Sequence, residues 1–202
     1  MNLPHSDAAE RNKTVIAQVL RELLGSQSYN VLEIGSGTGQ HAVYFAKTFD
    51  LLTWHSSDCG DYLPAVSARV EQARLDNLPP TIELDVNEFV DVPDVDVIYT
   101  ANTLHIMSWS SVCRLMTEAG ARLPASGRLV IYGPFDVGGQ PTSASNAHFD
   151  ASLRARDAQM GVRGREAVCF EADRAGMSLQ RVFAMPANNQ MLVFERRARV
   201  EC

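Results

Sequence analysis

The sequence lacks the features that mark metal-binding, secreted and membrane-spanning proteins. Its four cysteines lie far apart and form no C-x-x-C pair, so a zinc site is not expected. No run of about 18 apolar residues occurs, and the polar N-terminus has no signal-peptide core. We therefore expect a cytoplasmic protein with free thiols, no bound metal and no membrane association.

Positive charge is also scarce, because 18 Lys and Arg stand against 24 Asp and Glu and the formal net charge is -6 at pH 7. Such a chain has no excess of positive charge that would attract phosphate backbones or anionic lipid, so no nucleic-acid partner is expected. Internal repeats and low-complexity tracts are absent as well. The length of 202 residues, 46% of them hydrophobic, suits one globular domain, 1–202, whose oligomeric state the sequence leaves open.

Apolar periodicity predicts strands that alternate with helices. Strands are expected at 31–34, 51–54, 81–84, within 94–100 and at 128–132, with helices at 40–47, 62–75 and 110–123 and a first helix that Gly25 ends. This alternation favours a mainly parallel sheet covered on both faces. After a helix at 166–175, strands at 179–184 and 190–195 are joined by a short turn, which favours an antiparallel pair. The expected fold is a Rossmann-like, doubly wound α/β domain with seven strands.

A glycine-rich turn follows the first predicted strand in V-L-E-I-G-S-G-T-G-Q-H-A, residues 31–42. In open α/β sheets the first strand-to-helix turn is the usual ligand cradle. Gly35, Gly37 and Gly39 suit it, since glycine tolerates positive φ and lets backbone N–H groups approach a ligand. The alternative is a tight turn without a ligand.

Two aspartates follow the next two predicted strands. Asp58 comes about 20 residues after the loop, where a carboxylate can accept both ribose hydroxyls of a nucleotide-like ligand. Asp85, followed by Val86, ends the third strand. The alternatives are a solvated turn aspartate for Asp58 and a helix cap or loop acid for Asp85.

The motif E-I-G-S-G-T-G resembles the first motif of class I S-adenosylmethionine-dependent methyltransferases. Further stretches, A-E-R-N-K, N-T-L-H-I-M-S-W, Y-G-P-F and M-P-A-N-N-Q-M-L-V-F, extend the resemblance to an uncharacterised methyltransferase-like family of bacteria and animals, catalogued as a domain of unknown function. The resemblance implies a class I methyltransferase fold, S-adenosylmethionine as cofactor and S-adenosylhomocysteine as product. It also implies a small-molecule methyl acceptor, which the sequence does not identify.

The resemblance and the residue chemistry together give a set of candidate site residues. An N-terminal capping helix within 1–27 and a substrate lid at 133–165 are expected to enclose the site. His105 and His148 are candidate catalytic residues, because the unperturbed pKa of histidine lies near neutrality. The cofactor candidates are Arg11, Asn12, Lys13, Glu33, Gly35, Ser36, Gly37, Gly39, Asp58, Asp85, Val86 and Asn102. The substrate candidates are Trp109, Tyr132, Phe135, Asn146, Phe149 and Arg163.

For several of these residues a purely structural role is the alternative. His105 can be a structural histidine, and the basic residues near the start can form a solvated helix face. The Y-x-x-x-K pair of short-chain dehydrogenases is absent, because Asp136 stands four residues after Tyr132. The D/N-P-P-Y/F motif of nucleic-acid amino-methyltransferases is absent too. A methyltransferase is therefore expected, with an S-adenosylmethionine-binding sensor or scaffold and a nicotinamide oxidoreductase as alternatives.

Overall fold

The chain folds into two compact units, residues 1–99 and 100–202, in a computed structural model that describes residues 3–198. Strand β4 (Val97–Ala101) runs across the boundary between the two units. The parallel strands belong to the N-terminal half and the antiparallel pair to the C-terminal end. The predicted α/β class, with mainly parallel strands and a C-terminal antiparallel pair, is therefore confirmed.

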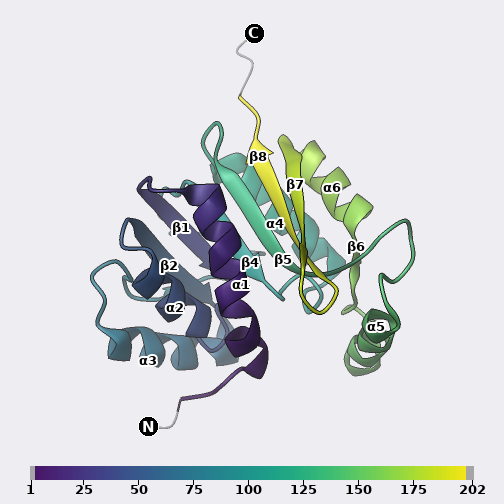
Figure 1. The fold of residues 1–202 in the computed structure, drawn as a ribbon, viewed down its shortest axis with the longest axis horizontal. Helices are drawn as coiled ribbons and strands as arrows, with labels where there is room; N and C mark the ends of the chain where they lie inside the picture. The colour runs from purple at the N-terminus through teal and green to yellow at the C-terminus, as the bar shows by residue number, and fades with distance from the viewer. Residues whose placement is uncertain (1–2, 199–202) are drawn as a thin grey trace. The chain divides into compact units, whose positions relative to one another are not determined.

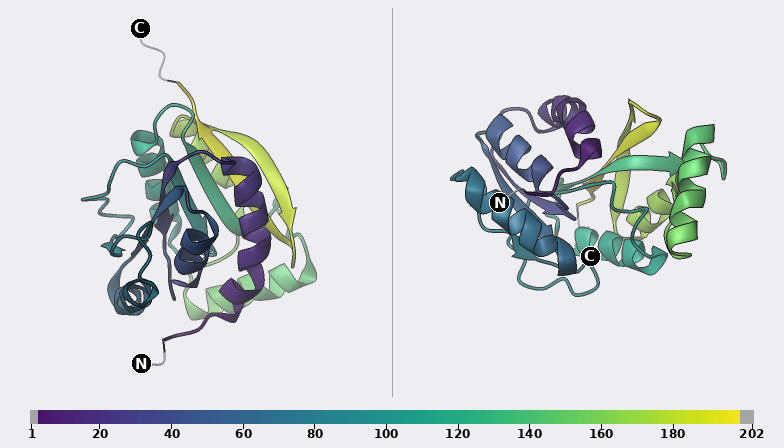
Figure 2. Two further views of the ribbon diagram at one scale, coloured as in Figure 1. Left: turned by 60° about the vertical axis from the view of Figure 1, so that its left-hand side comes forward. Right: turned by 90° about the horizontal axis from the view of Figure 1, so that it is seen from below.

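The first unit is built from parallel strands and three α-helices (Figure 1). Strand β1 pairs in parallel with β2, β2 pairs in parallel with β3, and β4 lies on the other side of β1. Helices α1 and α2 lie side by side, as both views in Figure 2 show. The elements are α1 (Asp7–Leu24), β1 (Tyr29–Ile34), α2 (Gln40–Thr48), β2 (Leu52–Asp58), η1 (Gly60–Tyr62), α3 (Leu63–Ala73) and β3 (Ile82–Glu83).

An aromatic cluster forms the centre of the first unit's core. The ring of Phe45 on α2 lies 5.0 Å from that of Trp54 on β2 and 5.7 Å from that of Tyr99 on β4. All three side chains are fully buried, as is Ile16 on α1. Burying such rings contributes several kcal/mol to folding, so this cluster fixes α2 against β2 and β4, the two strands that flank β1.

The second unit contains an antiparallel sheet with helices beside it (Figure 1). Strand β8 pairs with β5 on one side and β7 on the other, and the short strand β6 pairs in parallel with β5. Helices α4 and α6 contact each other closely at Gly120, where a Cβ would overlap the backbone oxygen of Ala175. The elements are α4 (Trp109–Arg122), β5 (Arg128–Asp136), α5 (Ala144–Arg156), β6 (Arg163–Gly164), α6 (Arg165–Arg174), β7 (Met177–Met185) and β8 (Asn189–Arg196).

Several predicted boundaries are corrected by the structure. Strand β2 continues to Asp58, because its last residues pair with both β1 and β3. Strand β5 extends to Asp136 through Pro134, whose missing N–H is tolerated where the strand pairs with the turn end of β8. The sequence predicts a helical piece around 149–158, whereas helix α5 begins five residues earlier, at Ala144, with Ser143 as its N-cap. The two-residue strand β6 was not expected.

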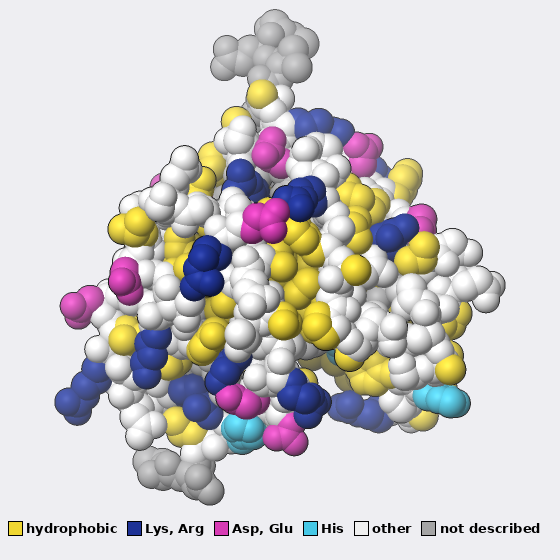
Figure 3. Space-filling view, viewed as in Figure 1, with side chains coloured by type: hydrophobic (Ala, Val, Ile, Leu, Met, Phe, Trp, Pro, Cys, Tyr) yellow, Lys and Arg dark blue, Asp and Glu magenta, His cyan; other side chains and the backbone are white. Residues whose placement is uncertain are grey.

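Charged side chains of both signs are interspersed on the face drawn in Figure 3. Within residues 3–198, no helix is long and apolar enough to cross a membrane. Cys59, Cys113 and Cys169 are free thiols, as predicted, whereas Cys202 lies outside the described residues.

Candidate functional site

The glycine loop, residues 35–39, joins β1 to α2 and adopts a conformation that only glycine takes without strain. Gly35, Gly37 and Gly39 have φ values of 70°, 58° and 72°, all in the left-handed region. A Cβ at Gly37 would meet no protein atom within 4 Å, so open space lies on that side of the loop. A Cβ at Gly39 would instead press on Val66 and Arg69 of α3, at 3.1 and 3.2 Å. The loop therefore packs on α3 at one end and faces open space at Gly37.

The end of β2 holds the loop in place. The backbone N–H of Gly37 donates to Asp58 Oδ2 at 2.6 Å, and the N–H of Cys59 donates to Asp58 Oδ1 at 2.9 Å. Burial raises the pKa of the Asp58 carboxyl, while the Gly37 and Cys59 hydrogen bonds oppose that rise. Ser36 adds a second link, because its N–H donates to the Ser57 oxygen at 2.9 Å. The structure thus brings together Asp58 and the glycine loop, which are separate candidates for cofactor binding in the sequence.

Asp85 lies close to Asp58 in space although the two are far apart in the sequence. The N–H of Leu84, the residue before Asp85, donates to the backbone oxygen of Asp58 at 2.9 Å. The Asp85 carboxylate is exposed and accepts the backbone N–H of Asn87 at 2.8 Å, while Val86 is buried. Burial and the carboxylates of Asp58, Asp85 and Glu83 raise the pKa of the Cys59 thiol. This edge of the first unit is therefore acidic.

Glu33 lies in β1 directly before the loop and is buried, with 2% of its surface exposed. The indole N–H of Trp54 donates to Glu33 Oε2 at 2.9 Å. Burial raises the pKa of Glu33 to about 7, and the nearby Asp58 charge adds to the rise, while hydrogen bonds from Trp54 and Ser36 oppose it. Glu33 is therefore part of the buried core next to the loop, where it is held by Trp54.

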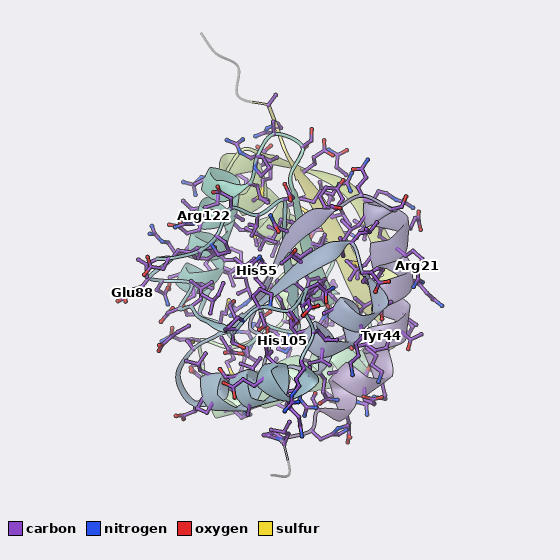
Figure 4. All side chains as sticks on the ribbon, turned by 90° about the vertical axis from the view of Figure 1, so that its left-hand side faces the viewer. Arg21, Tyr44, His55, Glu88, His105 and Arg122 are labelled. Carbon is purple, nitrogen blue, oxygen red and sulfur yellow. The ribbon has the colours of Figure 1, made fainter. Side chains whose placement is uncertain are left out.

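Of the three N-terminal candidates, only Asn12 turns toward the interior. Asn12 Oδ1 lies 2.7 Å from His41 Nε2, and both residues are buried. Burial lowers the pKa of His41 to about 4, so its imidazole is neutral at physiological pH. Lys13 pairs with Glu10 and lies 5.0 Å over the ring of Tyr44, which is on the side of α2 next to α1 (Figure 4). Arg11 is exposed.

Two residues that the sequence did not single out connect the N-terminal segment to the loop. The Gln40 side chain accepts the Ser6 N–H at 2.6 Å and the Thr38 hydroxyl at 2.9 Å. Arg69 donates to the oxygens of Thr38 and Pro4, each at 2.5 Å. Gln40 stands inside the quoted motif G-T-G-Q-H-A, so its position was a usable signal, whereas nothing in the sequence marks Arg69.

In the second unit, the residues after β4 form a separate group. Asn102 has a φ of 60°, and its N–H donates to the backbone oxygen of Tyr132 at 2.8 Å. Its side-chain oxygen would lie 3.8 Å from a Cβ at Gly133. Asn102 and Tyr132 are thus neighbours, and the Tyr132 ring is buried in the core of this unit.

His105 follows in the same loop and contacts α5. Its ring lies 5.0 Å from that of Phe149 in an edge-to-face arrangement. Burial, helped by the charge of Arg163, lowers the pKa of His105 to about 4. The imidazole is therefore neutral at physiological pH. His148, the other catalytic candidate, is exposed on α5.

The remaining substrate candidates have defined structural partners. The guanidinium of Arg163 lies 6.0 Å over the Trp109 ring. Asn146 is buried, and its amide donates to the Thr142 hydroxyl at 2.9 Å and to the Asn188 oxygen at 3.2 Å, which ties α5 to the β7–β8 turn. Phe135 is buried in β5. The direct roles of these residues toward a substrate stay predictions.

Comparison with known families gives a match over almost the whole chain. The family described as "Protein of unknown function (DUF938)" matches residues 3–196. This agrees with the resemblance that the sequence motifs carry.

Solved structures of methyltransferases share the fold. An O-methyltransferase family protein from Burkholderia thailandensis superposes with a TM-score of 0.79 at 16% identity, over 95% of this chain and 58% of that one. An O-methyltransferase family 2 protein from Planctomyces limnophilus, in complex with apigenin, gives 0.75 at 18% identity, over 96% and 62%. Human N-acetylserotonin methyltransferase in complex with SAM gives 0.73 at 11% identity, over 92% and 55%. The chain thus spans less than two thirds of the length of these proteins.

Proposed function

The chain belongs to this family of unknown function, and we propose that it is an S-adenosylmethionine-dependent methyltransferase that acts on a small or medium-sized acceptor. The observation that carries the proposal is the glycine loop. Three alternate glycines take left-handed φ values, Gly37 faces open space, and Asp58 stands against the loop at the end of the adjacent strand. Cofactor-bearing methyltransferases of the same fold support the choice of ligand.

The first unit supplies the residues that would hold the cofactor. Gly35, Gly37 and Gly39 allow the backbone to approach it closely, and the carboxylates of Asp58 and Asp85 suit hydroxyl and amino donors. The acidic edge around Cys59 suits a ligand that carries positive charge. S-adenosylmethionine, when bound, supplies a methyl group already activated on a sulfonium. The protein then has to align the acceptor and, for some acceptors, remove a proton.

His105 in the second unit is the proposed contact for the acceptor. A neutral imidazole with a low pKa accepts hydrogen bonds but is a weak base. We therefore expect an acceptor atom that has no proton to lose or loses one readily, such as the oxygen of an acidic hydroxyl. The complex of a structurally similar protein with apigenin is in keeping with an acceptor of this kind.

A matched pair of glycine substitutions tests the cofactor site. Gly37 and Gly25 have φ values of 58° and 59°, and a Cβ at either would meet no atom within 4 Å. Alanine at either position therefore has to adopt a positive φ that side chains rarely take, without a steric clash in the protein. Gly25 ends α1, away from the loop. We expect Gly37→Ala to weaken S-adenosylmethionine binding at least tenfold in calorimetric titrations, and Gly25→Ala to bind like the wild type.

Urea unfolding of both variants provides the control, because it shows whether either variant has lost its fold. Unchanged affinity in Gly37→Ala would show that the loop does not contact the cofactor and would remove the proposed site. Tight binding without transfer of a labelled methyl group to any component of a metabolite extract would favour the sensor.

A further inference from the structure

Arg163, the first residue of β6, lies almost buried in the second unit, with 8% of its surface exposed. Its three hydrogen-bond partners are backbone oxygens. The guanidinium donates to Leu104 O at 3.0 Å, to Gln159 O at 2.7 Å and to Met107 O. A buried cation costs free energy unless its donors are satisfied, so this arrangement fixes both the side chain and the carbonyls around it.

Two of those carbonyls belong to the loop that carries His105. Leu104 and Met107 flank His105, and the backbone oxygen of His105 itself accepts the Gly161 N–H at 2.9 Å. The loop is thus held at three carbonyls by residues 161–163. We call this set of contacts the Arg163 clamp.

Helix α5 also contacts residues 161–163, through Asp150. Asp150 Oδ1 accepts the Val162 N–H at 2.7 Å, and Asp150 Oδ2 accepts from Arg154 at 2.8 Å. Gly161 has a φ of 149°, and a Cβ there would lie 2.6 Å from the Arg154 guanidinium. A side chain at residue 161 would have to displace the Arg154 guanidinium and take a φ that residues other than glycine rarely adopt.

The backbone of His105 is therefore fixed while its imidazole is left for another use. Its ring contacts the edge of Phe149, and among residues 3–198 no protein group makes a hydrogen bond to it. A polar ring on a rigid loop, packed against an aromatic side chain, is suited to meet a ligand.

From these contacts we propose that Arg163 is a positioning residue, which holds the loop at 104–107 so that the His105 imidazole is presented to the methyl acceptor. The identity of the ligand as a methyl acceptor rests on the proposed function, whereas the contacts that hold the loop do not depend on it. Arg163 Nε and Nη2 already donate to backbone carbonyls, so these two nitrogens are engaged in holding the loop.

The state of the His105 ring reports on the clamp directly. The charged group that acts on the ring is Arg163 on β6, and Asp150 and Arg154 on α5 act in turn on Arg163. Asp136 on β5, whose Oδ1 is buried without a hydrogen-bond partner, lies in the field of Asp150 and Arg154. Arg163 opposes protonation of the ring, and the clamp keeps the ring buried. A role of Arg163 limited to general stability would not change the titration of one particular histidine in the folded protein.

The experiment follows the five histidines by NMR in protein labelled at histidine, with the His105 signal assigned from its loss in His105→Gln. In Arg163→Met, we expect the His105 titration midpoint to rise toward 6.5 and its modification by diethyl pyrocarbonate to accelerate at least tenfold. Arg163→Lys should fall between this variant and the wild type, because a lysine reaches fewer carbonyls. Arg165→Met is the matched control. Its guanidinium contacts Gln190 and Glu166 and not the loop, so His105 should behave as in the wild type.

An unchanged His105 midpoint and modification rate in folded Arg163→Met would overturn the proposal. If that variant does not fold, Arg163→Lys decides, and wild-type behaviour of His105 in it counts against the clamp. Calorimetry with S-adenosylmethionine separates the two proposals. Failure of the wild type to bind it removes the proposed function, whereas the His105 measurements need no cofactor and judge the clamp alone.

Discussion

Replacing Glu33 by glutamine should change how the stability of the protein depends on pH. The carboxyl is buried beneath the glycine loop, and its pKa in the folded protein is about 7, compared with an ordinary value of 4.5. Below pH 4.5 the group is protonated in both the folded and the unfolded state and carries no charge penalty. As the pH rises from 4.5 to 7, the unfolded state ionises while the folded state keeps its proton, so stability is lost over that range and the loss levels off above pH 7.

The size of this loss follows from the difference between the two pKa values. One pKa unit corresponds to about 1.4 kcal/mol, so the penalty grows to roughly 3 kcal/mol above pH 7. Glutamine keeps an oxygen that can accept the Trp54 N–H but does not titrate. The stability of Glu33→Gln relative to the wild type should therefore improve by roughly 3 kcal/mol between pH 4.5 and pH 8.

Urea unfolding followed by circular dichroism at several pH values measures this difference. His41 has the opposite dependence, because its low folded pKa removes stability as the pH falls below 6.5. His41 is present in both proteins, and its Nδ1 lies 4.0 Å from Glu33 Oε1, so the comparison reports on the Glu33 carboxyl together with this contact. A difference that stays constant from pH 4.5 to 8, or that changes in favour of the wild type, would refute the buried-carboxylate interpretation.

Two further predictions concern Asp58 and Asn12. Asp58→Ala removes the acceptor of the Gly37 N–H and should weaken S-adenosylmethionine binding by about 1–3 kcal/mol in calorimetry, whereas Asp61→Ala, in the adjacent 3-10 helix, should bind normally. Equal affinities would contradict a role for Asp58. Asn12→Ala removes the side-chain partner of buried His41 Nε2 and should lower the free energy of unfolding by about 1–3 kcal/mol. Arg11→Ala, at an exposed position, should change it by less than about 0.5 kcal/mol in urea titrations. Equal stability of the two variants would show that the buried pair adds nothing.

The sequence predicted the strands, helices and the glycine turn, because their patterns lie within short stretches of the chain. Alternating apolar and polar runs located the strands and helices, and the spacing of Gly35, Gly37 and Gly39 anticipated a loop with three left-handed residues. Asp58 was predicted to follow the second strand as a ribose-binding carboxylate; the structure places that carboxylate against the loop, and its role toward a ribose stays a prediction. These predictions succeeded because the chain order of strand, turn and helix itself brings these groups together.

Contacts that depend on packing could not be read from the sequence. Nothing around Arg69 indicates that it bonds to Pro4 and Thr38, since those partners lie 65 and 31 residues away. Arg163 looked like a cation available to a substrate, yet its donors face carbonyls of a loop 56–59 residues earlier in the chain. The burial of Glu33 against Trp54 likewise depends on the pairing of β1 with β2.

Calorimetric titration of the wild-type protein with S-adenosylmethionine, S-adenosylhomocysteine and NAD tests the central claim most directly. The glycine loop with Asp58 beside it predicts binding of the first two and no measurable binding of NAD. Binding of NAD alone would identify a nicotinamide oxidoreductase, and no binding of any of the three would contradict the assignment of the loop as a cofactor site.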